Sequence, residues 1–165
     1  MKTFIVLTFI GILTCACANF VTISECKNPR PMTGFSATKF FQGTWYVTHV
    51  KNVTGANVCQ SFSTSTPSDG KYVTEYSLNQ NDGTNVRCEA GREEDQKLTF
   101  NCQKGGVDIY QAVFVVLGTD YNDYAVFYRC IIFTSGTKAD NYLALSRTSG
   151  NEDIYGAQGL IKDLD

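Results

Sequence analysis

Apolar and polar positions alternate in short runs from residue 43 onward, and each run ends at a cluster of Gly, Asn, Asp or Ser. The runs are rich in Val, Ile, Thr, Tyr and Phe, which favour β-strands, and the clusters have the composition of turns. Strands at this regular spacing, with short connections, predict an all-β antiparallel barrel or sandwich. Eight strands are predicted, at residues 43–51, 58–65, 71–78, 84–90, 97–103, 108–117, 124–133 and 141–147.

The run from Tyr124 to Phe133 is apolar on both of its faces. Because side chains alternate along a strand, residues 124, 126, 128, 130 and 132 share one face, and the residues between them share the other. One of the two sets has to line the interior, and the pattern leaves both choices open.

A short C-terminal helix is predicted after the last strand. Ser149 and Glu152 have the spacing of a capping box, and apolar residues recur at helical spacing up to Ile161. Two glycines within this segment each cost about 1 kcal/mol relative to alanine, so we expect the helix to depend on packing against the barrel.

The first eighteen residues have the composition of a secretory signal peptide. Lys2 is followed by an apolar run from Phe4 to Leu13, and small residues at Ala16 and Ala18 form a cleavage site before Asn19. The run is shorter than the roughly 20 residues that span a bilayer. We therefore expect residues 1–18 to be removed, and residues 19–165 to form one secreted domain with no membrane anchor.

The charge of the mature chain excludes some classes of function. Residues 19–165 carry 13 basic and 16 acidic side chains, without the basic stripe that a nucleic-acid surface needs. No Ser/His/Asp set, metal cluster or phosphate-binding loop is evident. We expect a monomeric binding protein that is not an enzyme and that uses no metal or other cofactor.

Five cysteines remain after the signal peptide: Cys26, Cys59, Cys88, Cys102 and Cys130. Cysteines of a secreted chain are expected to pair, and an odd number leaves one over. Zinc binding is the competing interpretation, but no CxxC spacing is present and the chain has a single histidine. Disulfides are therefore the favoured interpretation.

Three short motifs resemble the conserved regions of the lipocalins, in the order and at the spacing found there: Gly43-Thr44-Trp45, Thr119-Asp120-Tyr121 and the arginine after the last strand, Arg147. A tryptophan at the start of a barrel provides a large apolar plug, and an arginine can cover the indole face. Gly43 permits a close backbone approach, and Asp120 can accept backbone N–H groups in its turn. We expect Gly43, Trp45, Asp120 and Arg147 to close one end of the barrel.

Residues 31–35, 39–49 and 121–125 are similar to the triabin-type salivary lipocalins of blood-feeding triatomine bugs, a group that includes procalin-like allergens and pallidipin-like platelet inhibitors. The resemblance implies an eight-stranded up-and-down barrel, secretion into saliva and interference with host haemostasis.

The resemblance also implies a pairing of the cysteines. The family pattern joins Cys26 to Cys130 and Cys88 to Cys102. The counterpart of Cys59 pairs with a cysteine near the C-terminus, which this sequence lacks. We therefore expect the natural chain to extend beyond Asp165.

Two further residues lie near the end of the first predicted strand. His49 is four residues after Trp45, so in a regular strand its side chain lies on the same face. We expect it to line the cavity or its rim, without binding haem. Asn52 begins the sequon Asn-Val-Thr and is a candidate glycosylation site in a surface turn.

Three binding functions remain open. The barrel can hold a small hydrophobic or amine agonist of haemostasis, and an amine would require a carboxylate, for which Glu75 and Asp108 are candidates. Alternatively, the outer surface binds a host protein such as thrombin or another coagulation protease. A generic carrier of hydrophobic ligands is the third possibility.

Overall fold

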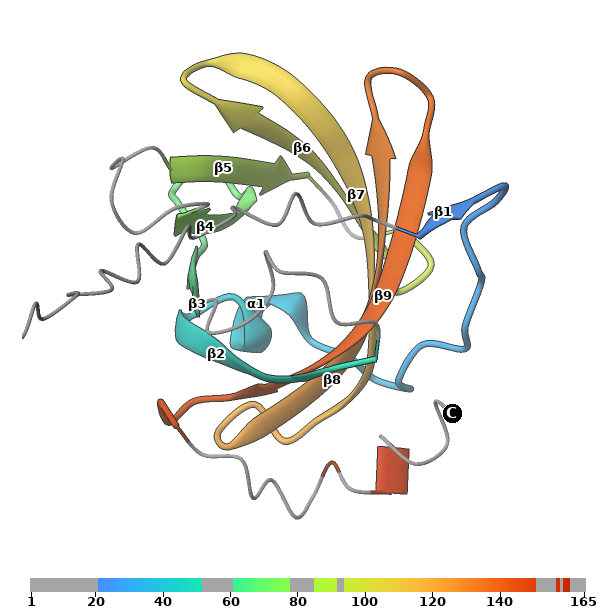
Figure 1. Cartoon of the computed structure of the whole chain (residues 1–165). Coiled ribbons are helices and arrows are strands. Elements are labelled where there is room, and N and C mark those ends of the chain that lie inside the picture. Colours follow the sequence, from blue (N-terminus) through green and yellow to red (C-terminus); the bar gives the residue numbers. More distant parts are fainter. Residues whose placement is uncertain are drawn as a thin grey trace, which may run out of the picture.

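Eight consecutive strands form a closed barrel in the computed structural model, which describes residues 21–51, 61–77, 85–91, 94–150, 157 and 159–160 (Figure 1). The signal peptide, Asn52, Cys59 and most of the predicted C-terminal helix lie outside the described residues. The barrel strands are β2 (Gly43–Val50), β3 (Ser61–Ser65), β4 (Tyr72–Ser77), β5 (Asn85–Ala90), β6 (Leu98–Lys104), β7 (Val107–Thr119), β8 (Tyr124–Phe133) and β9 (Lys138–Ser146).

Every barrel strand pairs antiparallel with the next one along the chain. The barrel closes because β9 pairs with β8 on one side and with β2 on the other, where Tyr46 lies opposite Ser146. The predicted all-β, eight-stranded up-and-down barrel is confirmed.

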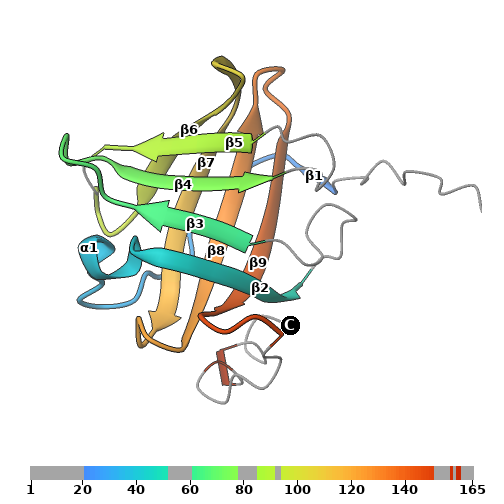
Figure 2. The same cartoon turned by 90° about the vertical axis from the view of Figure 1, so that its left-hand side faces the viewer.

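Two short elements were not predicted. Strand β1 (Thr22–Ile23) pairs with the start of β9, and helix α1 (Ala37–Phe40) precedes β2. Neither is long enough to show a period of two or of 3.6 residues, on which prediction from hydrophobic pattern depends. Figure 2 shows α1 at the end of the barrel where β2 begins.

Strand β8 has no face that is left to solvent, and this explains its double apolar pattern. Ala125 and Phe127 point into the barrel and belong to its main apolar core. On the outer face, Val126 packs with Ala157 and Leu160 of the C-terminal segment. The odd-numbered residues of β8 therefore face the barrel interior, and the even-numbered residues face outward.

The segment between β1 and α1 is fastened to the outer face of β8. Cys26 forms a disulfide with Cys130, and the N–H group of Lys27 donates to Tyr128 Oη at 2.7 Å. The Tyr128 hydroxyl lies 3.2 Å from Asp140 Oδ2, to which it donates, and burial raises the pKa of this tyrosine. The disulfide and these hydrogen bonds hold the segment against β8 and β9.

We expect the two disulfides to stabilise the fold unequally. The Cys26–Cys130 disulfide spans 104 residues, whereas Cys88–Cys102 spans 14. In the chain-entropy model, loops of these sizes correspond to about 4.7 and 3 kcal/mol. In a Cys59→Ser background, urea unfolding of the Cys26→Ser/Cys130→Ser variant should show the larger loss of unfolding free energy. An equal or smaller loss than in Cys88→Ser/Cys102→Ser would contradict this expectation.

Candidate ligand-binding cavity

The inward-facing side chains of the barrel surround a cavity that is mostly aromatic and apolar. The space between them, including the part that opens to solvent, is about 500 Å³, but only about 40 Å³ is available to the centre of a water-sized molecule. Since one water needs roughly 10–15 Å³ of such space, a ligand larger than a few waters requires aromatic rings to move. The lining residues are Phe40, Phe41, Trp45, Phe62, Thr64, Thr74, Tyr76, Cys88, Phe100, Cys102, Tyr110, Ala112, Phe114, Phe127, Arg129 and Leu145.

The floor of the cavity is built by α1 and the start of β2. Helix α1 carries Phe40 to the barrel axis, where its ring stacks on Trp45 with 5.1 Å between ring centroids. The indole N–H of Trp45 donates to the carbonyl of Phe40 at 3.1 Å, so this buried polar group is satisfied. Phe41 and Phe114 extend the same aromatic layer, with their ring centroids 5.9 Å apart.

Arg147 covers the outer side of this floor. Its guanidinium carbon lies 3.6 Å from the centroid of the Trp45 ring. Its N–H groups donate to the carbonyls of Thr44 at 3.1 Å, of Phe40 at 3.2 Å and of Tyr121 at 3.2 Å. It also donates to the carbonyl of Gln42, and burial lowers the pKa of the arginine. One cation thus joins the segment before β2 to the turn between β7 and β8.

Gly43 allows this approach, since its φ of +70° is a left-handed conformation that side chains rarely adopt. A Cβ at this position would lie 3.7 Å from Arg147 Nη1, which is an ordinary van der Waals contact, so the requirement for glycine comes from the backbone conformation. The backbone conformation at residue 43 is therefore adapted to glycine.

Asp120 organises the neighbouring turn. Its Oδ1 atom accepts hydrogen bonds from the backbone N–H groups of residues 122, 123 and 124 at 3.1, 2.8 and 3.0 Å. The N–H group of Arg147 donates to the carbonyl of Asp123 at 3.1 Å. The structure thus brings Gly43, Trp45, Asp120 and Arg147 together at one end of the barrel.

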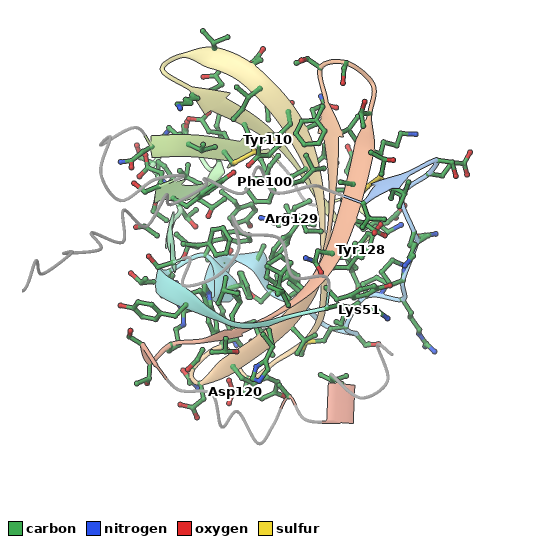
Figure 3. The ribbon with its side chains drawn as sticks, viewed as in Figure 1. Lys51, Phe100, Tyr110, Asp120, Tyr128 and Arg129 are labelled. Atoms are coloured by element: carbon green, nitrogen blue, oxygen red, sulfur yellow. A yellow bond between two sulfur atoms is a disulfide. The ribbon has the colours of Figure 1, made fainter. Side chains whose placement is uncertain are left out.

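The cavity wall beyond the floor contains groups that can recognise a polar ligand. The disulfide between Cys88 and Cys102 lies in this wall, joining β5 to β6. Arg129 extends from β8 into the barrel, and Figure 3 places it near the axis, close to Phe100 and Tyr110. Burial lowers the pKa of Arg129, and burial raises the pKa of Tyr110 to about 12, with the charge of Arg129 opposing that rise.

Sequence reasoning did not single out Arg129 as a site residue. The sequence shows it only as a single charged residue within an otherwise apolar run, two residues after Phe127 and therefore on the same face of the strand. With both faces of the run apolar, the direction of the arginine became apparent only from the barrel geometry.

The prediction that the His49 side chain points into the barrel was wrong, because His49 is exposed. A β-bulge between Val47 and His49 shifts the register of β2 against β9 and breaks the alternation that begins at Trp45. Val47 and Val50, on either side of the bulge, both pack against the core.

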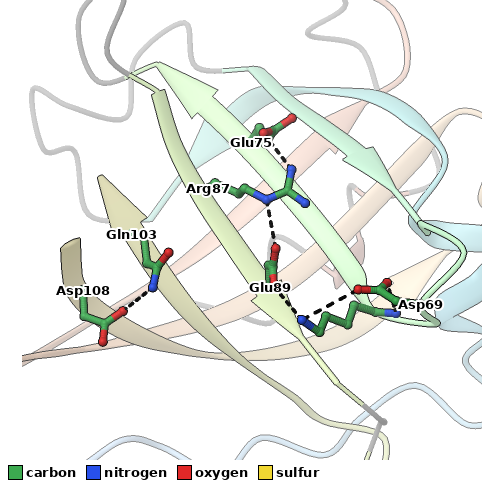
Figure 4. A network of polar contacts seen from close by, with 7 residues as sticks. Asp69, Glu75, Arg87, Glu89, Gln103 and Asp108 are labelled. Atoms are coloured by element: carbon green, nitrogen blue, oxygen red, sulfur yellow. Dashed lines mark hydrogen bonds and ion pairs between the residues drawn. The ribbon is translucent and has the colours of Figure 1, made fainter. Parts of the chain in front are cut away.

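The two candidate carboxylates also lie outside the cavity (Figure 4). Glu75 accepts a hydrogen bond from Arg87 Nη1 at 3.0 Å, and Asp108 accepts one from Gln103 Nε2 at 2.7 Å. Arg87 also pairs with Glu89, and the hydrogen bonds from Arg87 and Lys71 lower the pKa of that carboxyl. These contacts form a polar surface over β4 to β7, so neither candidate faces a ligand in the barrel.

Among the described residues, no three His, Cys, Asp or Glu side chains gather in a way that could hold a metal ion. No helix within the described ranges is long and apolar enough to cross a membrane. The two disulfides fit an extracellular protein.

Comparison with known proteins identifies the family. The model of the triabin family matches residues 16–157. The chain belongs to the triabin family. It is 38% identical to procalin of Hospesneotomae protracta, over 93% of this chain and 90% of procalin. It is 31% identical to platelet inhibitor triplatin-2 of Triatoma infestans, over 79% of this chain and 75% of that protein.

A solved structure resembles this triabin-family protein in fold and sequence. It is a mutant of the protein LTBP1 in complex with leukotriene C4, with a TM-score of 0.66 and 28% identity. The match covers 82% of this chain and 84% of that one.

The closed end is expected to depend on Arg147. Replacing it by methionine removes the cover of Trp45 and the hydrogen bonds to the partly buried carbonyls of Thr44 and Tyr121, which we expect to cost about 2–4 kcal/mol of unfolding free energy. Since Trp45 is the one tryptophan of the chain, its emission should shift to longer wavelength. Arg87→Met is the matched control, because exposed ion pairs contribute at most about 1 kcal/mol. Equal effects of the two substitutions would refute the assignment.

Proposed function

We propose that this protein is secreted in the saliva of a blood-feeding insect and impairs host haemostasis by sequestering a small agonist of platelet aggregation within its barrel. The observation that carries the proposal is the aromatic cavity, which is closed at one end by Trp45 and Arg147. Concave sites of this kind, with apolar walls and a few polar groups, are typical of small-molecule binding.

Sequestration fits the chemistry of the described residues. A ligand that enters the barrel buries its apolar surface against phenylalanine side chains, which is favourable by about 25 cal/mol per Å². Such binding lowers the free concentration of an agonist in proportion to the protein present, and it needs neither catalysis nor a cofactor. The names of two similar proteins support this direction, since one is a platelet inhibitor and the other was crystallised with leukotriene C4.

The proposal is tested with platelets stimulated by ADP, collagen, arachidonate or a thromboxane mimetic, with a clotting-time assay alongside. We expect inhibition where the stimulus acts through a small agonist that the cavity holds, and no change in clotting time. Thr74 lines the cavity, so Thr74→Phe fills part of the space for a ligand and should abolish the inhibition. Thr99→Phe places the same side chain at an exposed position of β6 and should leave the inhibition intact.

Two other results would contradict the proposal. Prolonged clotting that persists in the Thr74→Phe variant would indicate binding of a coagulation protease such as thrombin through the outer surface. No effect in any assay would mean that the protein does not act on haemostasis. Circular dichroism and thermal unfolding of both variants show whether each is folded.

A further inference from the structure

A second hollow lies on the outside of the barrel, between two hairpins. Strands β6 and β7 form one hairpin and strands β8 and β9 form the other, and Figure 1 shows their tips as separate loops. Pairing between β7 and β8 begins only at Tyr110 and Phe133, so the two strands part beyond this pair. The cleft between them offers about 250 Å³ to the centre of a water-sized molecule, against about 40 Å³ in the barrel interior. A side chain of another molecule can therefore enter the cleft as it stands.

The cleft combines a polar wall with an apolar one. On the side of β6 and β7 it is lined by Asn101, Asp108 and Gln111, and a hydrogen bond of 3.0 Å joins the side chains of Asn101 and Gln111. On the side of β8 it is lined by Ile132 and Phe133. Such a surface suits a ligand whose aliphatic part lies against the apolar wall while its polar end reaches the opposite side.

A β-bulge directs Asp108 to this cleft. Cys102 lies opposite Tyr110 and Gln103 lies opposite Asp108, so Ile109 is an additional residue on β7. Ile109 and Tyr110 both pack against the barrel core. In a regular strand Asp108 would share the face of Tyr110, but the bulge interrupts the alternation and places it on the outside. The backbone geometry of β7 therefore presents this carboxylate to the cleft.

The charge of the cleft is negative, since Asp108 is the one charged side chain among the described residues that line it. Its Oδ1 atom accepts a hydrogen bond from the neutral Gln103 at 2.7 Å (Figure 4), and none of the ion pairs in the described part of the chain includes it. By contrast, Glu75 and Glu89 on the same outer face both pair with Arg87, at 3.0 and 2.9 Å. A cation is therefore the ligand that complements this carboxylate.

The strand edge beside the cleft indicates that the cation belongs to a polypeptide. Val107 and Asp108 pair with β6 on one side, and no described strand pairs with the stretch from Val107 to Ile109 on the other. An unpaired strand edge offers backbone N–H and C=O groups to an extended chain. Val107 is also 66% exposed, which adds apolar contact area at the same edge.

We propose that this cleft is a docking site for an extended segment of a partner protein. The backbone of the segment aligns with the edge of β7, and one of its lysine or arginine side chains enters between the hairpins to meet Asp108. The aliphatic stem of that side chain lies along Ile132 and Phe133. The site is on the outside of the barrel, so it adds a protein partner to the small ligand proposed for the interior.

Bead-bound libraries of pentapeptides test the site, with random flanking residues and with lysine, arginine, norleucine or glutamate fixed at the centre. We expect the fluorescently labelled protein to bind the lysine and arginine libraries about fivefold more tightly than the norleucine library, as for a partly exposed ion pair. The glutamate library should bind most weakly. Raising the salt concentration to about 0.5 M should reduce the preference for lysine over norleucine, because salt screens exposed charges.

Variants assign the preference to the cleft. Asp108→Asn keeps the shape of the side chain and should abolish the preference for lysine over norleucine, and Asp108→Lys should reverse it in favour of glutamate. Glu75→Gln is the matched control, because it removes one negative charge from the same outer face, and it should leave the preference unchanged. Thr74→Phe fills part of the barrel interior and should also leave peptide binding unchanged, so docking and cavity binding can fail separately.

Competition experiments test the part played by the backbone. Butylamine, which reproduces the lysine side chain alone, should displace a tightly bound lysine peptide at least tenfold less effectively than the same peptide in solution. Methylation of the backbone nitrogens of that peptide should weaken its binding, because it removes donors to the edge of β7.

Three results would overturn the proposal, provided that circular dichroism shows each variant to be folded. Equal competition by butylamine and by the peptide would mean that the cleft takes small amines and does not dock a polypeptide. Equal binding of the four libraries, or binding of none, would mean that the cleft does not recognise a basic segment. A preference for lysine that persists in Asp108→Asn would mean that the peptides bind elsewhere.

Discussion

The packing of Arg147 on Trp45 is the interaction on which the barrel interior depends. A barrel is open at both ends unless something covers them, and here one guanidinium covers the indole while donating to carbonyls from two distant segments. Those carbonyls belong to the chain before and at the start of β2 and to the turn after β7, so the arginine fastens both across the closed end. The aromatic floor can remain dry because the polar groups around it are satisfied.

Arg147 at the closed end and Arg129 in the cavity wall illustrate how the surroundings determine what a charged side chain does. Arg147 is engaged by backbone carbonyls and by an aromatic face, and it serves the architecture. Arg129 lies among the side chains that line the cavity, two residues beyond a floor residue on the same strand. Burial lowers the pKa of both arginines, but Arg147 closes the end of the barrel whereas Arg129 lines its interior.

Much of the fold was predictable from residue patterns, and the failures have definite physical causes. Alternation located all the barrel strands, because each has to present one face to the core. The same rule placed His49 inward, where a single bulge in β2 reversed the alternation. It gave no direction for Arg129, because the outer face of β8 is covered by chain segments distant in sequence. Contacts between segments that far apart along the chain cannot be predicted from the alternation of apolar and polar residues within one strand.

The separation between the closed end and the cavity wall has an evolutionary consequence. Residues that close the barrel are fixed by one another, whereas an inward wall position such as Thr74 contributes to the sheet mainly through its backbone. Substitution at a few wall positions can therefore change which ligand the barrel binds without changing its fold.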